Sequence, residues 1–242
     1  MSDHQHIVSS FDRDLETIQA HIMKMGGMVE RAISDAARSL ETRDDELAEE
    51  VRGRDKAIDA LEEQINEEAA RVLALRSPAA RDLRVVLTVI KISASLERIG
   101  DYAKNMAKRT SVLSQMAAVN GSPSALRRMA REVEEMLKDV LDAYIQRDMD
   151  LAHEVIRRDL DVDQMYNAIF REFLTFMMED PRNITPCMHL HFIAKNTERM
   201  GDLVTSIAEQ VIYLVSGQFP DDPRPKSDTT SVDPSLAPKG SH

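Results

Sequence analysis

Hydrophobic residues along most of this chain recur at alternating spacings of four and three, the pattern of helices that bury one stripe in a bundle. One stripe contains Val85, Val89, Ile92, Leu96, Ile99, Ala103 and Met106. Another contains Leu47, Val51, Ile58, Leu61, Ile65 and Val72. Alternating β-branched runs bounded by tight turns, which would indicate strands, do not occur in the sequence. The chain is therefore predicted to be all-α.

Proline positions indicate where the helices end, because a proline inside a helix costs about 3 kcal/mol or more. Pro78, Pro123, Pro181 and Pro186 lie between periodic segments, and the other five of the nine prolines lie between residues 220 and 238. Asp44 and Asp148 are predicted N-caps. We expect six helices, over about residues 10–43, 44–75, 79–116, 124–147, 148–179 and 186–216.

The second half of the chain repeats the first. Positions in the first two helices match positions 104 residues later, and positions in the third helix match positions 101 residues later. The matched residues include Val29 with Val133, Glu30 with Glu134, Asp35 with Asp139, and the acidic residues described below. We expect two tandem three-helix bundles, residues 7–117 and 123–217, end to end or side by side. Residues 218–242 are too poor in apolar side chains to fold and are expected to be a disordered tail.

Acidic residues recur in pairs four apart at equivalent places in both repeats. Glu97 and Asp101 flank Gly100, just beside the apolar stripe of their helix, and Asp55 and Asp59 lie on the preceding helix. If these antiparallel helices are neighbours, the four carboxylates face one groove. The second repeat offers Asp159, Asp163, Glu198 and Asp202 in the same arrangement.

Three interpretations of these acidic pairs stay open. Like charges four apart cost only a few tenths of a kcal/mol, so a solvated acidic face is acceptable for any one pair. Arg98 and Arg199 stand beside the pairs and could neutralise them directly. A bound cation is the third possibility, and four pairs at equivalent places favour it. The glycines, Gly100 and Gly201, either allow close helix packing or clear space above the carboxylates.

Oxygen ligands select hard or borderline cations such as Mg²⁺, Mn²⁺, Ca²⁺ or iron. Cys187 is the only cysteine, so a closed zinc site of the structural type is not supported, and disulfides within the chain are excluded. The histidines are few, and those at 153, 189 and 191 are not expected to be ligands.

The net charge is −11, from 42 acidic and 31 basic side chains, and it opposes binding to nucleic acid or anionic lipid. We expect partners to be proteins or cations. The sequence has neither a secretory leader pattern nor an apolar run of about 18 residues, and its cysteine usage fits a reducing compartment. The expected location is the cytoplasm, with membrane association only through partners.

Several stretches resemble the PhoU family of phosphate-signalling regulators. They are "KMGGMVERAI" at 24–33, "LERIGDYAKNMA" at 96–107, "FMMEDPRNI" at 176–184 and "TERMGD" at 197–202, and the resemblance covers about residues 7–217. It implies two PhoU domains with pseudo-twofold symmetry. It also implies metal sites at E(D)xxxD motifs, which correspond here to the eight acidic residues above and would bind iron, manganese, magnesium or zinc.

The resemblance further implies a negative regulator of phosphate uptake and of the phosphate-starvation response. Such a protein would contact the PstB ATPase of the Pst phosphate importer and the PhoR sensor kinase, and it would form a homodimer. Thr197 stands where the first repeat has Leu96, and Ser206 stands opposite Asn105, so the two metal sites are expected to be unequal.

The sequence does not predict an enzyme. Phosphate-binding GxxxxGK[ST] loops, HExxH motifs and nucleophile elbows are absent from it. A carboxylate-bridged oxidase would place Glu-x-x-His motifs in a bundle core, and no such motif occurs. That oxidase and an accessory subunit of another phosphate transporter remain the alternatives to a signalling adaptor.

Overall fold

The computed structural model describes residues 2–76, 81–119 and 122–220. This part of the chain forms six α-helices and one short 3-10 helix, without strands. The elements are α1 (Ser2–Thr42), α2 (Asp45–Arg76), α3 (Arg81–Leu113), α4 (Ser122–Gln146), α5 (Met149–Glu179), η1 (Pro181–Asn183) and α6 (Ile184–Ser216). The all-α prediction is confirmed. The expected tail falls outside the described residues from position 221 onward.

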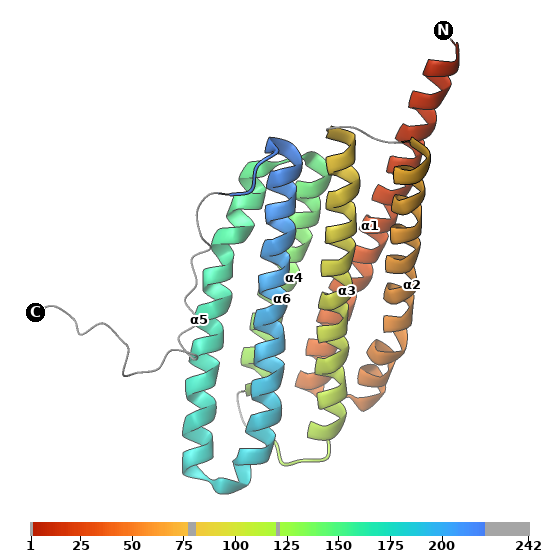
Figure 1. Ribbon diagram of the computed structural model, residues 1–242. Helices are drawn as coiled ribbons and strands as arrows, with labels where there is room; N and C mark the ends of the chain where they lie inside the picture. The colour runs from red at the N-terminus through yellow and green to blue at the C-terminus, as the bar shows by residue number, and fades with distance from the viewer. Residues whose placement is uncertain (1, 77–80, 120–121, 221–242) are drawn as a thin grey trace, which may run out of the picture.

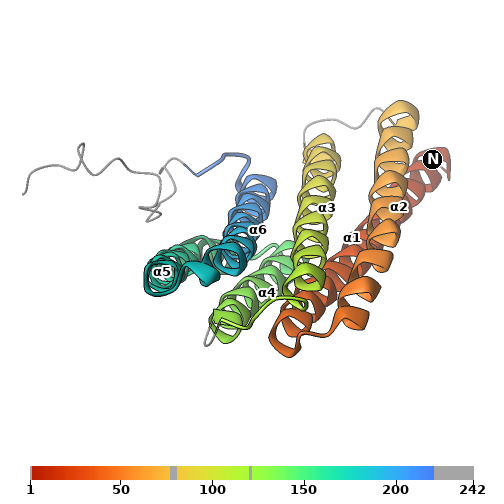
Figure 2. The same ribbon diagram turned by 90° about the horizontal axis from the view of Figure 1, so that it is seen from below.

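The helices of each repeat form one group, and the two groups lie side by side (Figures 1 and 2). The helices α1, α2 and α3 pack on one another, as do α4, α5 and α6. The groups meet where α3 packs against α6 and α1 against α4. Side chains at this interface are buried: Met106 and Thr197 have no exposed surface, and the Thr197 hydroxyl lies 3.7 Å from the Met106 sulfur. The arrangement is therefore lateral, with one continuous hydrophobic core.

The apolar stripes expected from the sequence form this core. Of the stripe on α3, every residue from Val89 to Met106 is buried, and Val85 is half-buried. On α2, Leu47 is half-buried and the other five residues are buried. Full burial of one such side chain contributes about 1.5–3 kcal/mol. In the first repeat α2 packs against α3, and in the second repeat α5 packs against α6. The acidic pairs of each repeat therefore face each other between these two helices.

The turns between the first and second helix of each repeat have the same design. Asp148 accepts hydrogen bonds from the amides of Asp150 and Leu151 at the start of α5, and Asp44 accepts one from Leu47 at the start of α2. Both predicted N-caps are thus confirmed. The preceding residues, Arg43 and Arg147, have φ of 56° and 57°, the left-handed conformation that reverses the chain.

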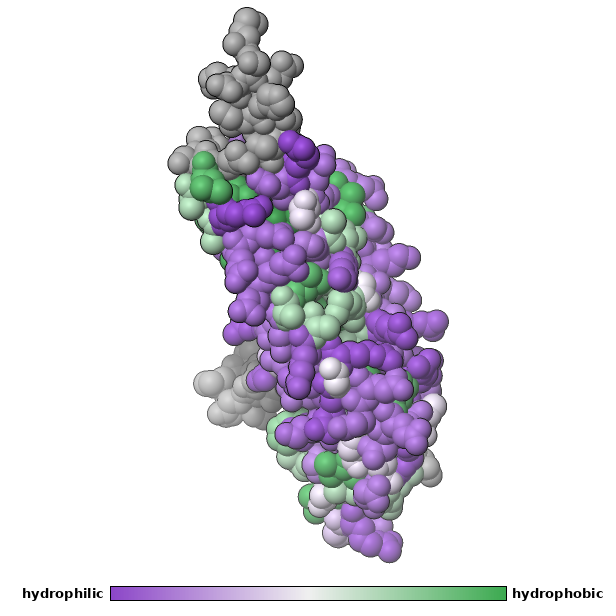
Figure 3. All heavy atoms as spheres, turned by 90° about the vertical axis from the view of Figure 1, so that its right-hand side faces the viewer, coloured by the Kyte–Doolittle hydropathy of each residue, from purple (hydrophilic) through white to green (hydrophobic). Residues whose placement is uncertain are grey.

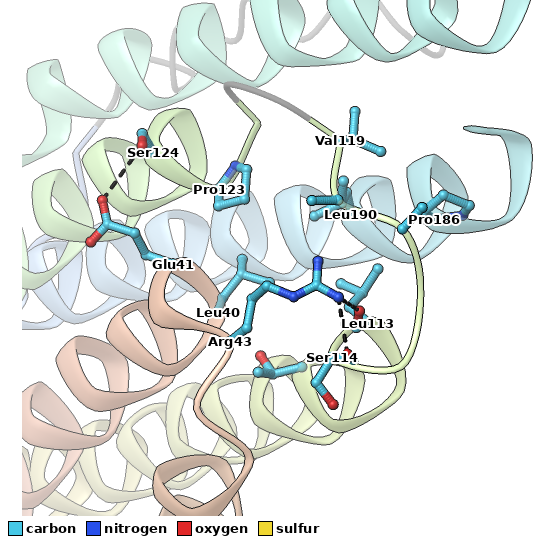
Figure 4. A pocket seen from close by; sticks show the side chains of 13 residues that line it. Leu40, Glu41, Arg43, Leu113, Ser114, Val119, Pro123, Ser124, Pro186 and Leu190 are labelled. Atoms are coloured by element: carbon cyan, nitrogen blue, oxygen red, sulfur yellow. Dashed lines mark hydrogen bonds between the residues drawn. The ribbon is translucent and has the colours of Figure 1, made fainter. Parts of the chain in front are cut away.

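The third helix ends at Leu113, three residues earlier than predicted, because a side chain from another turn satisfies its last carbonyls. Nη2 of Arg43 donates to the carbonyl oxygens of Leu113 and Ser114 at 2.7 and 3.0 Å (Figure 4). It also donates to the carbonyl oxygen of Met116 at 2.5 Å. The carbonyls at a helix end have no partner within the helix, and a cation there also suits the helix dipole. The Arg43 side chain thereby fixes the α1–α2 turn to the end of α3.

None of the helices in the described ranges combines the length and the apolar character that crossing a membrane requires.

Candidate metal centre

The first acidic cluster lies where α2 faces α3. Asp55 on α2 is 4% exposed, and its Oδ2 accepts a hydrogen bond from Nζ of Lys104 at 2.5 Å. The same ammonium lies 3.1 Å from Oδ1 of Asp101. Lys104 therefore joins one carboxylate of each helix, and these contacts raise its pKa above the ordinary value.

Asp59 and Glu97 complete the set expected from the sequence. Burial raises the pKa of Glu97, and the nearby carboxylates of Asp101 and Asp59 raise it further. Asp59 is exposed, but partial desolvation raises its pKa, followed by repulsion from Asp55. The structure thus brings all four predicted carboxylates of the first repeat into one cluster, where like charges repel.

A fifth carboxylate, Glu62, belongs to this cluster and was not predicted. Its charge raises the pKa of both Asp59 and Glu97. Glu62 follows Asp55 by seven residues and Asp59 by three, so it lies on the same face of α2. The spacing of four and then three residues from Asp55 to Asp59 to Glu62 is the sequence signal that indicates this third acidic residue on the same helix face.

Gly100 allows α2 to pack closely on α3 beside these carboxylates. A Cβ atom at this position would lie 3.1 Å from Cδ1 of Ile58 and 3.9 Å from Oδ1 of Asp55. Oδ1 of Asp55 is fully buried and has no hydrogen-bond partner among the described residues. One oxygen of the Asp55 carboxylate therefore accepts a hydrogen bond from Lys104, whereas the other is an unsatisfied acceptor near the backbone of Gly100.

The second cluster lies where α5 faces α6, and it is buried more deeply. Asp159, Asp163 and Glu198 are 6%, 5% and 6% exposed, and Asp202 is half-buried. A Cβ atom at Gly201 would lie only 2.9 Å from Oδ1 of Asp159. This glycine makes room for a carboxylate of the facing helix, so the two repeats use the glycine for related but different contacts.

The second cluster also has a different cation and one carboxylate fewer. Nζ of Lys195 lies 3.0 Å from Oε1 of Glu198 and 4.9 Å from the ring centroid of Tyr166. By the repeat offsets, Tyr166 corresponds to Glu62 and Lys195 corresponds to Ala94, whereas Lys104 corresponds to Thr205. The two lysines thus approach the clusters from opposite ends.

Lysines, not the adjacent arginines, pair with these carboxylates. In the residues that the structure describes, Arg98 and Arg199 are exposed and form no ion pair with a carboxylate. Neutralisation by arginine, one of the three interpretations of the sequence, therefore does not account for the clusters. The sequence did not predict the roles of Lys104 and Lys195. Each lies three residues from the acid that it contacts, whereas the arginines are directly adjacent to the acidic residues.

The donor chemistry of the clusters suits a hard cation, because it consists of carboxylate oxygens with one buried and unsatisfied. Their positions do not yet suit one. Among the described residues, no group of three or more His, Cys, Asp or Glu side chains is arranged to hold a metal ion. In the first cluster the Lys104 ammonium lies between the carboxylates of Asp55 and Asp101, so a metal bound there must displace it.

A family model for the PhoU domain matches the chain twice, over residues 22–110 and 126–211. The chain belongs to the PhoU family. Each match falls within one of the repeats and includes its acidic cluster. The PhoU resemblance seen in the sequence is thereby confirmed, as is the fold class.

Curated relatives match this member of the PhoU family over nearly their whole length and nearly the whole of this chain. It is 44% identical to the phosphate-specific transport system accessory protein PhoU homolog of Rhizobium meliloti, over 95% of this chain and 97% of that one. It is 43% identical to the homolog of the same description from Caulobacter vibrioides, over 94% and 99%. The crystal structure of PhoU from Pseudomonas aeruginosa superposes with a TM-score of 0.83 at 39% identity, covering 86% of this chain and 100% of that chain.

Proposed function

We propose that this protein is an accessory protein of a phosphate-specific transport system and represses phosphate uptake and the phosphate-starvation response. The observation that carries the proposal is its similarity, over nearly the whole chain, to relatives described as accessory proteins of that system. A solved structure with the same fold, from Streptococcus pneumoniae, is described as a phosphate transport system regulatory protein; the TM-score is 0.78 at 28% identity. In this proposal the protein is an adaptor without enzymatic activity. It acts in the cytoplasm as a homodimer.

The acidic clusters are the proposed cation sites of this adaptor. Asp55, Asp59, Glu97 and Asp101 would hold metal in the first repeat, with Glu62 as an additional ligand or neighbour. In the second repeat the ligands would be Asp159, Asp163, Glu198 and Asp202. The proposed metal is iron, manganese, magnesium or zinc, and it would supply positive charge to the cluster.

Charge explains how cation binding could control a partner. Five carboxylates and one ammonium give the first cluster four formal negative charges when all are ionised. A divalent cation would lower this excess, release Lys104 and stiffen the contact between α2 and α3. Since a ligand biases only states that it distinguishes, cation binding would favour one form of this groove for docking. The proposed partners are the PstB ATPase and the PhoR sensor kinase.

The test combines metal analysis with partner capture. Asp101→Ala with Asp202→Ala removes one ligand from each cluster, and Glu63→Ala with Glu154→Ala removes the same charge from exposed positions on α2 and α5. We expect the first double variant to lose bound metal and to capture less PstB and PhoR, at high phosphate, with its helicity retained. The control should behave like the wild type. Full metal occupancy in the first double variant would show that Asp101 and Asp202 are not metal ligands.

A further inference from the structure

One face of the molecule has no helix packed on it in the part of the chain that the structure describes. The helices α2, α3, α6 and α5 form a row in which each packs against the next, and α1 and α4 pack against α3 and α6. Figure 2 shows α1 and α4 on the same side of this row. The opposite side of α3 and α6, which faces the viewer in Figure 1, is therefore uncovered.

Three cations of α3 lie along one edge of this surface, named here the α3–α6 face. Arg84, Lys91 and Arg98 are spaced by seven residues, and residues seven apart lie on nearly one line along a helix. The Arg84 guanidinium lies 5.5 Å from the ring centroid of Tyr213 on α6. The line that these cations form therefore runs along the side of α3 that adjoins α6.

Two further cations complete the α3–α6 face. Arg109 lies near the end of α3, and its guanidinium is 4.2 Å from the ring centroid of Phe192 on α6. Arg199 follows Phe192 by seven residues and precedes Tyr213 by fourteen. It therefore lies on the line of α6 that α3 contacts through both rings.

None of these five cations pairs with a carboxylate among the described residues. The Lys91 ammonium lies 5.4 Å from the ring centroid of Phe219, so three of the five rest on aromatic rings. Burial lowers the pKa of Arg109, whose polar neighbour is Nδ1 of His189 at 3.3 Å. Partly buried guanidinium groups without an anion are thus present on this face.

The side of the molecule formed by α1 and α2 pairs its arginines instead. Figure 3 looks onto this side, and its surface is mostly hydrophilic. Arg31, Arg38 and Arg54 all contact the carboxylate of Asp35 there. The whole protein has 42 acidic against 31 basic side chains, so cations that stay unpaired on one face are available for an acidic ligand.

Both repeats retain the exposed groups of the α3–α6 face. By the offset of 101 residues Arg98 corresponds to Arg199, and both are exposed. Leu87 corresponds to Met188, and these side chains are 42% and 41% exposed. Neither an exposed apolar side chain nor an unpaired exposed cation stabilises the fold, so retention of both in two halves favours a binding role.

The acidic clusters restrict what binds to this face, because one cluster lies on each side of it. They are about two interhelical distances apart, roughly 16–20 Å. A flat anionic membrane or a nucleic acid would meet these carboxylates and be repelled. A single helix, about 10 Å across, fits between the clusters. The exposed side chains of Leu87, Met188 and Phe192 offer it apolar contacts.

We propose that the α3–α6 face binds an amphipathic helix of a partner protein, with acidic residues spaced by seven. Its carboxylates pair with Lys91, Arg98 and Arg199. Its apolar stripe packs on Leu87 and Met188. The spacing matches that of Lys91 and Arg98, since both helices rise by about 1.5 Å per residue. This binding requires no metal, and it does not depend on the proposed role in phosphate transport.

The test uses the metal-free protein and a blocked, fluorescein-labelled peptide of three heptads, with Leu at positions a and d and Glu at e and g. Mutual repulsion of the glutamates keeps the free peptide from pairing with itself. Fluorescence anisotropy should show saturable binding that weakens with added salt. The same peptide with Lys in place of Glu, and one with the acidic sequence scrambled, should each bind about tenfold more weakly or worse.

A first double variant tests the cations. Arg98→Ala with Arg199→Ala removes two exposed side chains that have no ion pair in the described structure, so the helicity should be retained. It should bind the acidic peptide about tenfold more weakly. Arg128→Ala with Arg157→Ala removes the same charge from exposed positions on α4 and α5, and it should bind like the wild type.

A second double variant tests the apolar contacts and stays informative whatever the first does. Leu87→Gln with Met188→Gln should also weaken binding of the acidic peptide about tenfold, because its leucines lose their contacts. Leu174→Gln, at an exposed position on α5, is the control and should bind like the wild type.

Absence of saturable binding would overturn the proposal, as would equal affinity for the lysine or the scrambled peptide. Unchanged affinity in either double variant would place the peptide elsewhere and overturn it too. Two other occupants are tested with phosphatidylglycerol vesicles and by sedimentation velocity. Vesicle binding or self-association that the arginine variant abolishes would assign the face to a membrane or to a second copy of the chain. Since metal is absent throughout, none of these results bears on the cation sites.

Discussion

The ammonium nitrogen of Lys104 lies 2.5 Å from Oδ2 of Asp55, and this ion pair joins α3 to α2 in the middle of the first acidic cluster. The same lysine also lies 3.1 Å from Asp101. A positive charge that belongs to the protein therefore stands where we propose that a metal binds. Metal and lysine then compete for the same oxygens, which makes this residue the most direct way to test the site.

We predict that Lys104→Met raises the affinity for Mn²⁺ about tenfold or more, because a competing charge beside the ligands is removed. Without metal, the same variant should lower the free energy of unfolding by about 1–3 kcal/mol, since buried Asp55 loses its donor. Calorimetric titration and urea unfolding measure the two effects. Lys108→Met, at an exposed position on the same helix, is the control. Unchanged Mn²⁺ affinity would argue against a metal at these oxygens.

The raised pKa values of Asp59 and Glu97 predict how stability depends on pH. A carboxyl group whose pKa is higher in the folded state binds protons more tightly there, so the folded state loses stability as the pH rises through the interval between the two values. For Glu97 this interval begins at its ordinary pKa of 4.5 and extends upward. The metal-free protein should therefore bear a penalty at neutral pH that acidification removes.

Glu97→Gln isolates this contribution from the other titrating groups. The variant should have a higher melting temperature than the wild type at pH 7, and the difference should shrink toward pH 4.5. Glu63→Gln, at an exposed position on α2, should show no such pattern. An equal melting temperature for Glu97→Gln and the wild type across this range would show that the cluster carries no net repulsion.

The two cluster glycines should respond differently to alanine. Alanine gains about 1 kcal/mol over glycine within a helix, whereas overpacking costs about 1–3 kcal/mol. At Gly201 the new methyl would lie 2.9 Å from the Asp159 carboxylate, so Gly201→Ala should destabilise the protein. At Gly100 the nearest atom is the flexible end of Ile58 at 3.1 Å, and Gly100→Ala should be near neutral. Denaturant unfolding of both variants would measure the contrast, and a stabilised Gly201→Ala variant would contradict it.

Arg43 should be important for stability although it lies in a turn. Arg43→Ala removes the guanidinium donor from the carbonyls of Leu113, Ser114 and Met116, of which Leu113 keeps a bond from the Met116 amide, and the free energy of unfolding should fall by about 1–3 kcal/mol. Hydrogen exchange should increase at the end of α3 before it does elsewhere. Arg128→Ala, at an exposed position on α4, serves as the comparison. Equal exchange in both variants would mean that the α3 end is held by other contacts.

The sequence predicted those features that follow from local rules. Helix identity follows from apolar periodicity, and the ends at Asp44 and Asp148 follow from side chains that bond to nearby amides. The repeat placed the acidic pairs on equivalent helices, because equal spacing in two copies implies equal geometry. The side-by-side packing was left open, since apolar stripes do not reveal which outer faces of two bundles meet.

What the sequence did not predict depends on contacts between distant residues. Arg43 ends α3 from a position 70 residues earlier in the chain. Lys104 reaches Asp55 across 49 residues, and its local spacing to Asp101 was not distinctive.

The lateral packing of α3 on α6 and of α1 on α4 also bears on how the family can evolve. A chain with a single half would leave these faces uncovered, and two such chains would have to find each other by diffusion. Fusion makes that encounter intramolecular and therefore independent of expression level. It also releases the halves from identity, so each carries its own lysine beside its acidic cluster, Lys104 in one half and Lys195 in the other.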